Sequence, residues 1–334
     1  MTHGIYTSAN DVVYDQLVAL LNSIEVNAGP DIPVCVIAYD DRLDRVKTEI
    51  SQRKNVELLD DPELFAPWEQ FSYEVWKAHP YALKQWSEQG IQGVRRLGMN
   101  RRYCAFDSQA PFDKFLYFDA DVLVLNSLDY LFEQLNNRDV VVYDFQYKDP
   151  SHIYNANSEK LLDIFPEERI NREIFCAGFY GSKRGLLPPE QRAKVVNHLN
   201  SGEAEILYLS APNQSVLNYT LMRSELDIYN FALELPKEKR TGCSVTSPHF
   251  EEKDRRVYDK GVPLTYLHFI GISASIFTRL CSGENITFPY RDSFLYYRYL
   301  NEPECQPQFQ GKPVAYDRPK PSKNPVKRWL QNWI

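Results

Sequence analysis

Residues 115–124 read Phe-Leu-Tyr-Phe-Asp-Ala-Asp-Val-Leu-Val, and they carry the strongest signal for the fold in this sequence. Its apolar run ends in two carboxylates, Asp119 and Asp121, which are separated by one small residue, and the apolar run then resumes. A short continuous apolar run of this kind is typical of a strand that is buried on both faces. Such strands occur in parallel sheets covered by helices, so the stretch predicts an α/β protein.

The two carboxylates predict a metal site at the end of that strand. A carboxylate placed there is costly unless a partner neutralises its charge, and no Lys or Arg follows Lys114 close to the pair. In extended chain, residues i and i+2 point the same way, so Asp119 and Asp121 are expected to converge on one hard divalent ion. An ion held in this way can clamp the phosphates of a nucleotide. The alternative is that both residues only cap the turn toward a helix near Leu128.

Composition narrows the class of protein. The chain has 334 residues, of which 43% are hydrophobic and 25% charged, as in an ordinary globular protein of one large or two small domains. A net charge of −7 argues against nucleic acid as a partner, because binding to a phosphate backbone needs clustered Lys and Arg. The six cysteines are scattered, without the paired spacings of a zinc site. No signal peptide and no membrane span is visible, so we expect a cytoplasmic protein.

Strand and helix signals alternate through the first half of the chain. Strands are expected at 5–9, 33–39 and 56–59, with helices over 11–26 and 42–53 between them. This βαβαβ order predicts a mostly parallel central sheet flanked by helices, whose ligands bind beyond the carboxyl ends of the strands.

The rest of the chain divides into an insertion, further sheet elements and a tail. Residues 62–97 are rich in Trp and Tyr and predict a helical insertion within a domain that covers 1–300. The expected later elements are strands at 139–145, 175–181 and 264–271 and helices near 189–199 and 212–222. Residues 301–334 form a Pro-rich tail.

The order of these motifs resembles the GT-A glycosyltransferases, and in particular the retaining, glycogenin-like and bacterial galactosyltransferase-like family usually numbered eight. The resemblance covers roughly residues 3–280. Residues 116–122, Leu-Tyr-Phe-Asp-Ala-Asp-Val, match the Asp-x-Asp core of that family. The other matches, in chain order, are Arg102, Asp144, Cys176-Ala177-Gly178, Asn213-Gln214-Ser215-Val216-Leu217-Asn218 and His268-Phe269-Ile270-Gly271.

The resemblance implies a metal-dependent hexosyltransferase that moves a sugar from a nucleotide donor, a UDP-sugar, to an acceptor hydroxyl with retention. Asp119, Asp121 and His268 would hold the metal. Two carboxylates with one imidazole favour Mn²⁺, and Mg²⁺ is the alternative. Gln214 and Asp144 would act at the reacting sugar. The donor-binding residues would be Tyr6, Thr7, Asn10, Arg102, Ala120, Asp144 and Gly271. The acceptor, whether a sugar, a lipid-linked glycan or a protein, is not specified.

Several positions depart from the family pattern. Cys176 replaces an asparagine, the segment 213–218 has lost both of its carboxylates, and Ala274 stands where the family has a lysine that holds the donor's β-phosphate. Leaving-group stabilisation would then fall to the metal, Arg102 or Arg279. These losses keep open a non-catalytic relative that binds a nucleotide-sugar or a protein partner. A haloacid-dehalogenase-type phosphatase, with Asp119 as nucleophile, is a further alternative.

Other residues also have structural alternatives. Tyr6 and His268 would serve as core residues, while Asn10 and Gln214 would serve as helix caps. In the tail, Trp329, Leu330, Trp333 and Ile334 would share one helical face beside basic residues. That pattern predicts peripheral contact with an anionic membrane surface, the inner face of a membrane, unless the segment docks on the protein itself or on a second subunit.

Overall fold

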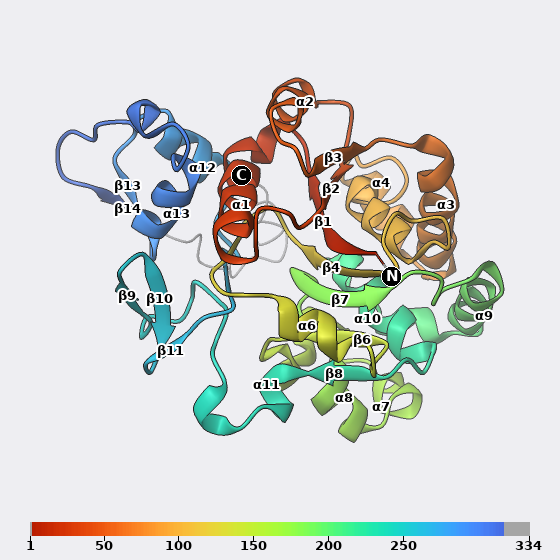
Figure 1. The fold of residues 1–334 in the computed structure, drawn as a ribbon. Coiled ribbons are helices and arrows are strands. Elements are labelled where there is room, and N and C mark those ends of the chain that lie inside the picture. Colours follow the sequence, from red (N-terminus) through yellow and green to blue (C-terminus); the bar gives the residue numbers. More distant parts are fainter. Residues whose placement is uncertain (1, 317–334) are drawn as a thin grey trace.

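A computed structural model describes residues 2–316, and its centre is a seven-stranded sheet (Figure 1). Across the sheet the order is β3 (Val56–Leu59), β2 (Val34–Ala38), β1 (His3–Ala9), β4 (Lys114–Phe118), β7 (Phe179–Lys183), β6 (Val140–Val142) and β8 (Ile228–Asn230). The pairs β1–β2, β2–β3, β1–β4 and β6–β8 are parallel, and β7 is antiparallel to both of its neighbours. The prediction of an α/β fold with a mostly parallel central sheet is confirmed.

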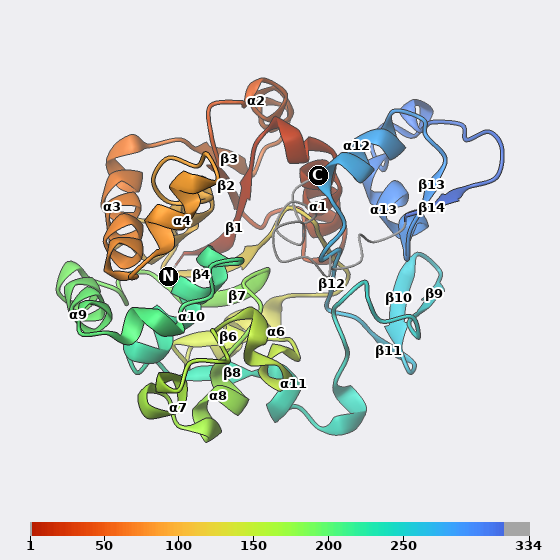
Figure 2. The same cartoon turned by 180° about the vertical axis from the view of Figure 1, so that it is seen from behind.

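Helices flank this sheet on both sides, as Figures 1 and 2 show. The α-helices are α1 (Tyr14–Asn27), α2 (Asp44–Ser51), α3 (Pro62–Ala78), α4 (Ala82–Glu88), α5 (Leu97–Asn100), α6 (Asp129–Gln134), α7 (Lys160–Ile164), α8 (Glu167–Glu173), α9 (Pro189–Asn200), α10 (Pro212–Arg223), α11 (Phe231–Glu234), α12 (Ala274–Cys281) and α13 (Arg291–Arg298). Short 3-10 helices include η1 (Asp11–Val13), η2 (Arg101–Phe106) and η4 (Pro150–His152).

Three smaller sheets accompany the central sheet within the described residues. The strands are β5 (Val122–Val124) with β12 (Tyr266–His268), β9 (Glu251–Lys253) with β10 (Arg256–Asp259) and β11 (Val262–Pro263), and β13 (Ile286–Thr287) with β14 (Val314–Ala315). The β5–β12 pair is antiparallel and sets His268 opposite Val122. It therefore brings a late segment of the chain to the end of β4.

The expected strand ends differ from the observed ones where the chain leaves the sheet to build loops. Strand β3 has the expected bounds, whereas β6 stops at Val142 instead of continuing to Phe145. Strand β7 begins only at Phe179, because Cys176 turns aside and its N–H donates to Asp144 Oδ2. The sequence stays largely apolar through these positions, but the backbone no longer pairs with a neighbouring strand.

The segment 62–97 contains helices α3 and α4, which pack their aromatic side chains inward. Trp68, Trp76 and Trp86 are fully buried, and the rings of Trp76 and Trp86 meet edge to face at 4.9 Å. Burial of three indoles removes a large apolar area from water, so this region is part of the main hydrophobic core.

A second, smaller core supports the C-terminal elements. Phe269 packs against Phe277, Phe288 and Phe294, and this cluster contains residues of both α12 and α13. Figure 1 places these two helices beside α1, on the side of the molecule away from α3. The cluster anchors the residue that directly follows His268, so it also fixes the position of that histidine.

The predicted membrane-contacting segment at 324–334 lies outside the described residues. Within residues 2–316, none of the helices combines the length and the apolar character needed to cross a membrane.

Candidate metal and nucleotide site

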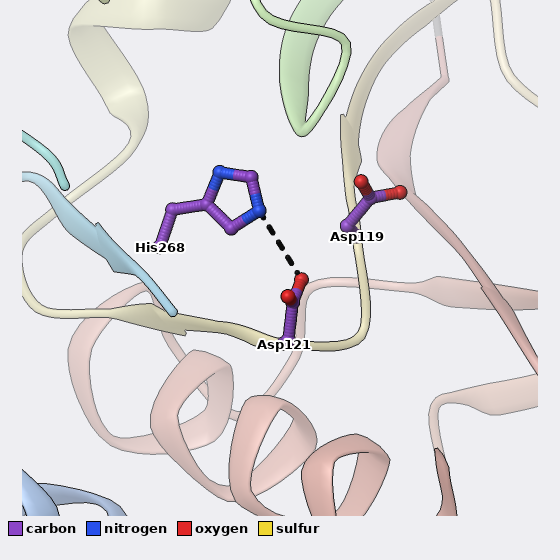
Figure 3. Close-up of side chains that lie close together, drawn as sticks. All are labelled: Asp119, Asp121 and His268. Atoms are coloured by element: carbon purple, nitrogen blue, oxygen red, sulfur yellow. Dashed lines mark ion pairs between the residues drawn. The ribbon is translucent and has the colours of Figure 1, made fainter. Parts of the chain in front are cut away.

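Asp119, Asp121 and His268 meet beyond the carboxyl end of β4 (Figure 3). One ligand atom from each of the three side chains lies within 4.8 Å of the others. His268 Nε2 is 3.3 Å from Asp121 Oδ1, and Asp119 faces the same space from the end of β4. Carboxylate oxygens and one imidazole nitrogen are ligands that suit Mn²⁺, so the donor set present here fits the expected divalent ion.

The two aspartates converge for a reason that differs from the predicted one. Residues 119–121 are not extended, because the chain turns between β4 and β5 and Val122 N donates to Asp119 O at 3.2 Å. A second backbone bond, from Asp119 N to Gly178 O at 2.9 Å, ties the turn to the segment before β7. The convergence therefore depends on a tight turn, and the argument from strand alternation is wrong.

Arg102 supplies the internal cation that neutralises Asp119. Its side chain is 0% exposed, and Nη2 donates to Asp119 Oδ1 at 2.9 Å. The same guanidinium donates to the carbonyls of Ala177 and Met99 and lies over the ring of Tyr117. Arg102 was expected to reach the donor, but the structure buries it beneath the site, where it orients Asp119.

Tyr117 completes the support of Asp119. Its hydroxyl donates to the same oxygen, Oδ1, at 3.0 Å. Since both side-chain hydrogen bonds use Oδ1, Oδ2 is the oxygen that Asp119 can offer to a cation, and its side chain is 23% exposed. A ligand held by neighbouring groups in this way loses little freedom when it binds.

His268 is placed by backbone pairing on both of its sides. Its N–H donates to Cys243 O at 2.7 Å, and Phe269 N donates to Asp121 O at 2.9 Å. Burial lowers the pKa of His268, but the adjacent Asp121 carboxylate raises it, and the net result is a pKa well above the usual value. The histidine belongs to the acidic cluster and is not simply a core residue.

Gly178 makes room for the imidazole. A Cβ added at this position would lie 2.2 Å from His268 Cε1, so a larger residue would displace the ring. The sequence motif includes this glycine, but nothing local in the sequence indicates that it contacts a histidine so far along the chain. Cys176 is a further neighbour that sequence reasoning missed, since its Sγ lies 4.0 Å from His268 Nδ1.

Asp144 and Gln214 lie next to the metal ligands, on the side of β6 and α10. Asp144 is only 4% exposed and accepts backbone N–H bonds from Gln146 at 2.7 Å and Cys176 at 3.0 Å. Gln214 does not cap α10, because its Oε1 accepts from Ala177 N at 3.0 Å and its Nε2 donates to the carbonyl of His152. Both side chains therefore hold the segment 176–178 that borders the metal ligands.

Burial raises the pKa of Asp144 to about 7, while the two N–H bonds and the charge of His268 lower it. We expect part of the pH dependence of stability to come from this group. The folded protein retains the proton up to about pH 7, whereas the unfolded chain releases it near 3.8. The stabilisation is therefore complete below that lower pKa and is lost as the pH rises through the higher one. Between about pH 5 and about pH 8 the loss is about 3 kcal/mol.

Urea unfolding at the two pH values measures this loss, and the Asp144→Asn protein should lack it. Comparing the pH difference within each protein removes the separate cost of the hydrogen bond that Asn cannot accept. Identical pH differences in the two proteins would contradict the raised pKa.

The remaining expected donor-binding residues divide into buried and turn positions. Tyr6 and Thr7 are fully buried in β1, and the Tyr6 ring packs against Phe112 at 5.0 Å. This corrects the expectation that Tyr6 binds the donor and favours its alternative role as a core residue, because no face of its ring is open to a ligand. Asn10 is a helix cap, as its Oδ1 accepts from Val12 N, and its Nδ2 donates to Asp40.

Ala120 and Gly271 occupy turns around the metal ligands. Ala120 lies between the two aspartates in the tight turn. Gly271 has a φ of +79°, a left-handed conformation that favours glycine, and it lies in the turn between β12, which ends at His268, and α12. Both residues thus shape the backbone next to the site.

Comparisons with known proteins give fold-level similarities. No protein-family model matches the chain, and no curated protein matches it. Among solved structures, the bifunctional glycosyltransferase WbbM matches at 14% identity with a TM-score of 0.49, over 89% of this chain and 49% of that one. The chain therefore spans about half the length of WbbM.

Two further similar structures are those of transferases. The galactosyltransferase LgtC, in complex with donor and acceptor sugar analogues, matches at 16% identity and a TM-score of 0.48, over 87% of this chain and 99% of that one. Mouse xyloside xylosyltransferase 1 matches at 8% identity and a TM-score of 0.48, over 69% and 85%. At these identities and TM-scores the similarities assign no activity, and the function proposed below rests on the side chains of the site.

Proposed function

We propose that this protein is a metal-dependent glycosyltransferase of the GT-A type that takes a nucleotide-sugar, a UDP-sugar, as its donor. The observation that supports this most strongly is the group of Asp119, Asp121 and His268 beyond the carboxyl end of β4. Two carboxylates and an imidazole at the edge of a mostly parallel sheet form a site for a divalent ion and the diphosphate that it binds.

When bound, a divalent ion would neutralise the negative charge that develops on the diphosphate as the glycosidic bond breaks. The chain itself keeps the ligands in place, since Arg102 and Tyr117 hold Asp119 through its Oδ1. Asp144, with its raised pKa, can both donate to and accept from hydroxyl groups of the donor sugar near neutral pH. Gln214 fixes the 176–178 segment next to the same space.

The family resemblance supports transfer to an acceptor hydroxyl with retention of configuration, with Mn²⁺ as the preferred ion. In this proposal a phosphate oxygen of the leaving group takes the proton of the acceptor hydroxyl. No carboxylate nucleophile is required, which agrees with the absence of acidic residues in 213–218.

A second candidate is a non-catalytic relative that binds the nucleotide-sugar without transferring the sugar. Ala274 favours this candidate, because the lysine expected at that position would have stabilised the leaving phosphate. The three expected metal ligands, Asp119, Asp121 and His268, lie together, so both candidates predict metal-dependent nucleotide binding.

A hydrolysis screen of nucleotide-sugars separates the two candidates. We expect slow release of nucleoside diphosphate from one or more UDP-sugars in the presence of Mn²⁺, and none after chelation by EDTA. Metal-dependent binding without release, together with no transfer to any acceptor tested, would favour the non-catalytic protein. No metal-dependent binding of any nucleotide would contradict both.

A further inference from the structure

The segment 94–102 crosses the carboxyl edge of the sheet from β2 to β4. Near β2, Arg101 Nη1 donates to Ala38 O at 3.1 Å, and Gly98 lies so close to Tyr39 that a Cβ would sit 2.2 Å from its carbonyl oxygen. Near β4, Arg102 binds Asp119. The segment is therefore fixed at both strands, and Arg96, the N-cap residue of its helix α5, lies at this edge of the sheet.

Arg96 has an unusual backbone conformation for a residue with a side chain. Its φ and ψ are 57° and 41°, in the left-handed region. Residues with a Cβ are disfavoured there, and such conformations are concentrated at functional sites, where the surrounding structure maintains them. The conformation sets the direction in which the long side chain leaves the segment.

Arg96 lies in a segment that runs along the same edge of the sheet as the metal ligands. Its side chain is exposed, yet nearby protein atoms lower its pKa, while the Tyr39 hydroxyl and the Asp119 carboxylate raise it. The charge of Arg102, directly beneath Asp119, lowers it as well. An arginine keeps its charge under all these influences, so Arg96 supplies a permanent, solvent-exposed cation at this edge of the sheet.

The charge balance of the site calls for such a cation. Asp119, Asp121 and Asp144 are the acidic residues at the site, and Arg102, the internal cation, is already paired with Asp119. With Arg102 paired to Asp119, a divalent ion and the two ligand carboxylates leave one net positive charge, which does not balance the charge of a diphosphate.

The two other positions considered for binding the diphosphate, 274 and 279, do not supply a cation for it. Position 274 is an alanine at the start of α12, and Arg279 lies in the last turn of the same helix. The guanidinium of Arg279 makes hydrogen bonds from Nε and Nη2 to Glu284 at 2.6–3.0 Å. Arg279 is thus engaged in a surface ion pair.

We propose that Arg96 binds the diphosphate of the nucleotide donor and takes the place of the missing lysine at position 274. This inference rests on the proposed function, since it assigns a phosphate contact within the same site. A guanidinium presents paired N–H donors that match two phosphate oxygens, which makes arginine well suited to this contact.

The test uses the full chain with Arg96→Asn, Arg96→Lys and, as a matched control, Arg279→Asn. Asn tolerates the left-handed region, so Arg96→Asn removes the charge and keeps the backbone. Calorimetric titrations with UDP, GDP and inorganic pyrophosphate, each with Mn²⁺, measure the contact directly. Thermal melts of every variant check that the fold is retained.

We expect Arg96→Asn to weaken binding of UDP and pyrophosphate by about tenfold or more, with a melting temperature close to that of the native protein. The affinity of the variant should also depend less on salt concentration, because one charge–charge contact that salt screens is lost. Arg96→Lys should restore part of the affinity, and Arg279→Asn should bind as the native protein does.

Native affinity and an unchanged salt dependence in Arg96→Asn would overturn the assignment of Arg96. The proposed function would survive that result if the native protein still bound UDP in a Mn²⁺-dependent manner. Failure of the native protein itself to bind any nucleoside diphosphate would instead overturn the proposed function, and the role of Arg96 with it.

Discussion

The Asp121→Asn protein is expected to fold normally and to lose metal-dependent nucleotide binding. Asp121 offers a carboxylate oxygen 3.3 Å from His268 Nε2, and its side chain is 24% exposed. Asn keeps the shape of the side chain but brings no negative charge to the cation. We expect the Kd for UDP with Mn²⁺ to rise about 100-fold, which corresponds to about 2.7 kcal/mol.

The fold should tolerate this change because the backbone bond made by Asp121 is kept and only its side-chain ion pair with His268 is lost. Phe269 N donates to the carbonyl oxygen of Asp121, and that bond is independent of the side chain. The expected loss of unfolding free energy is about 1 kcal/mol or less, since the substitution opens no cavity.

Calorimetry with UDP and Mn²⁺ measures the affinity, and melts with metal, nucleotide and both together measure the linkage. In the native protein, Mn²⁺ and UDP together should raise the melting temperature more than either ligand does separately. Asp41→Asn is a suitable control, because Asp41 is an exposed acid that follows β2 at the same edge of the sheet. Unchanged UDP affinity in Asp121→Asn would contradict the metal assignment.

Replacing Arg102 by Met is expected to cause the largest loss of stability among single changes at the site. The guanidinium is completely buried and donates to Asp119 and to the carbonyls of Ala177 and Met99. Met fills a similar volume but leaves these acceptors without a donor and the Asp119 charge without its partner. Removing one member of a buried ion pair costs about 3–5 kcal/mol.

Such a loss is a large part of a total stability of about 5–15 kcal/mol, so the effect is measurable by urea unfolding. Arg102→Lys keeps the charge and should lose less. Arg172→Met is the matched control, because Arg172 forms an exposed ion pair with Glu234 that contributes about 1 kcal/mol or less. A loss below about 1 kcal/mol in Arg102→Met would show that Asp119 does not depend on this pair.

The elements of the sheet could be read from the sequence because burial imposes a local pattern. The strands of a covered parallel sheet must be apolar on both faces, so β1, β2, β3 and β4 are visible as short hydrophobic runs. Helices α9 and α10 begin at Pro189 and Pro212 as expected, since proline is favoured in the first turn. Strand ends were less predictable where residues such as Asp144 leave the ladder to accept hydrogen bonds in loops.

The three metal ligands were predicted correctly as residues, but the way in which the chain brings them together was not. The sequence contains Asp119 and Asp121 side by side, and the family resemblance added His268. The local argument for their convergence assumed an extended chain, whereas the structure uses a turn closed by a backbone bond. It also assumed that no internal cation was available, because Arg102 is distant from Asp119 in the sequence and approaches it only in the folded chain.

The α/β class, most of the strands and helices, and the residues able to bind a metal could therefore be predicted from the sequence. Which of these residues lie close together depends on the tertiary structure. The pairing of β12 with β5 places His268 next to Asp121. Tyr6 is buried within β1 and is therefore not accessible to a ligand. Arg96 lies at the edge of the sheet because the segment 94–102 runs along it. Local periodicity reports which side of an element is buried, whereas these encounters depend on contacts between residues far apart in the chain, which leave no local pattern.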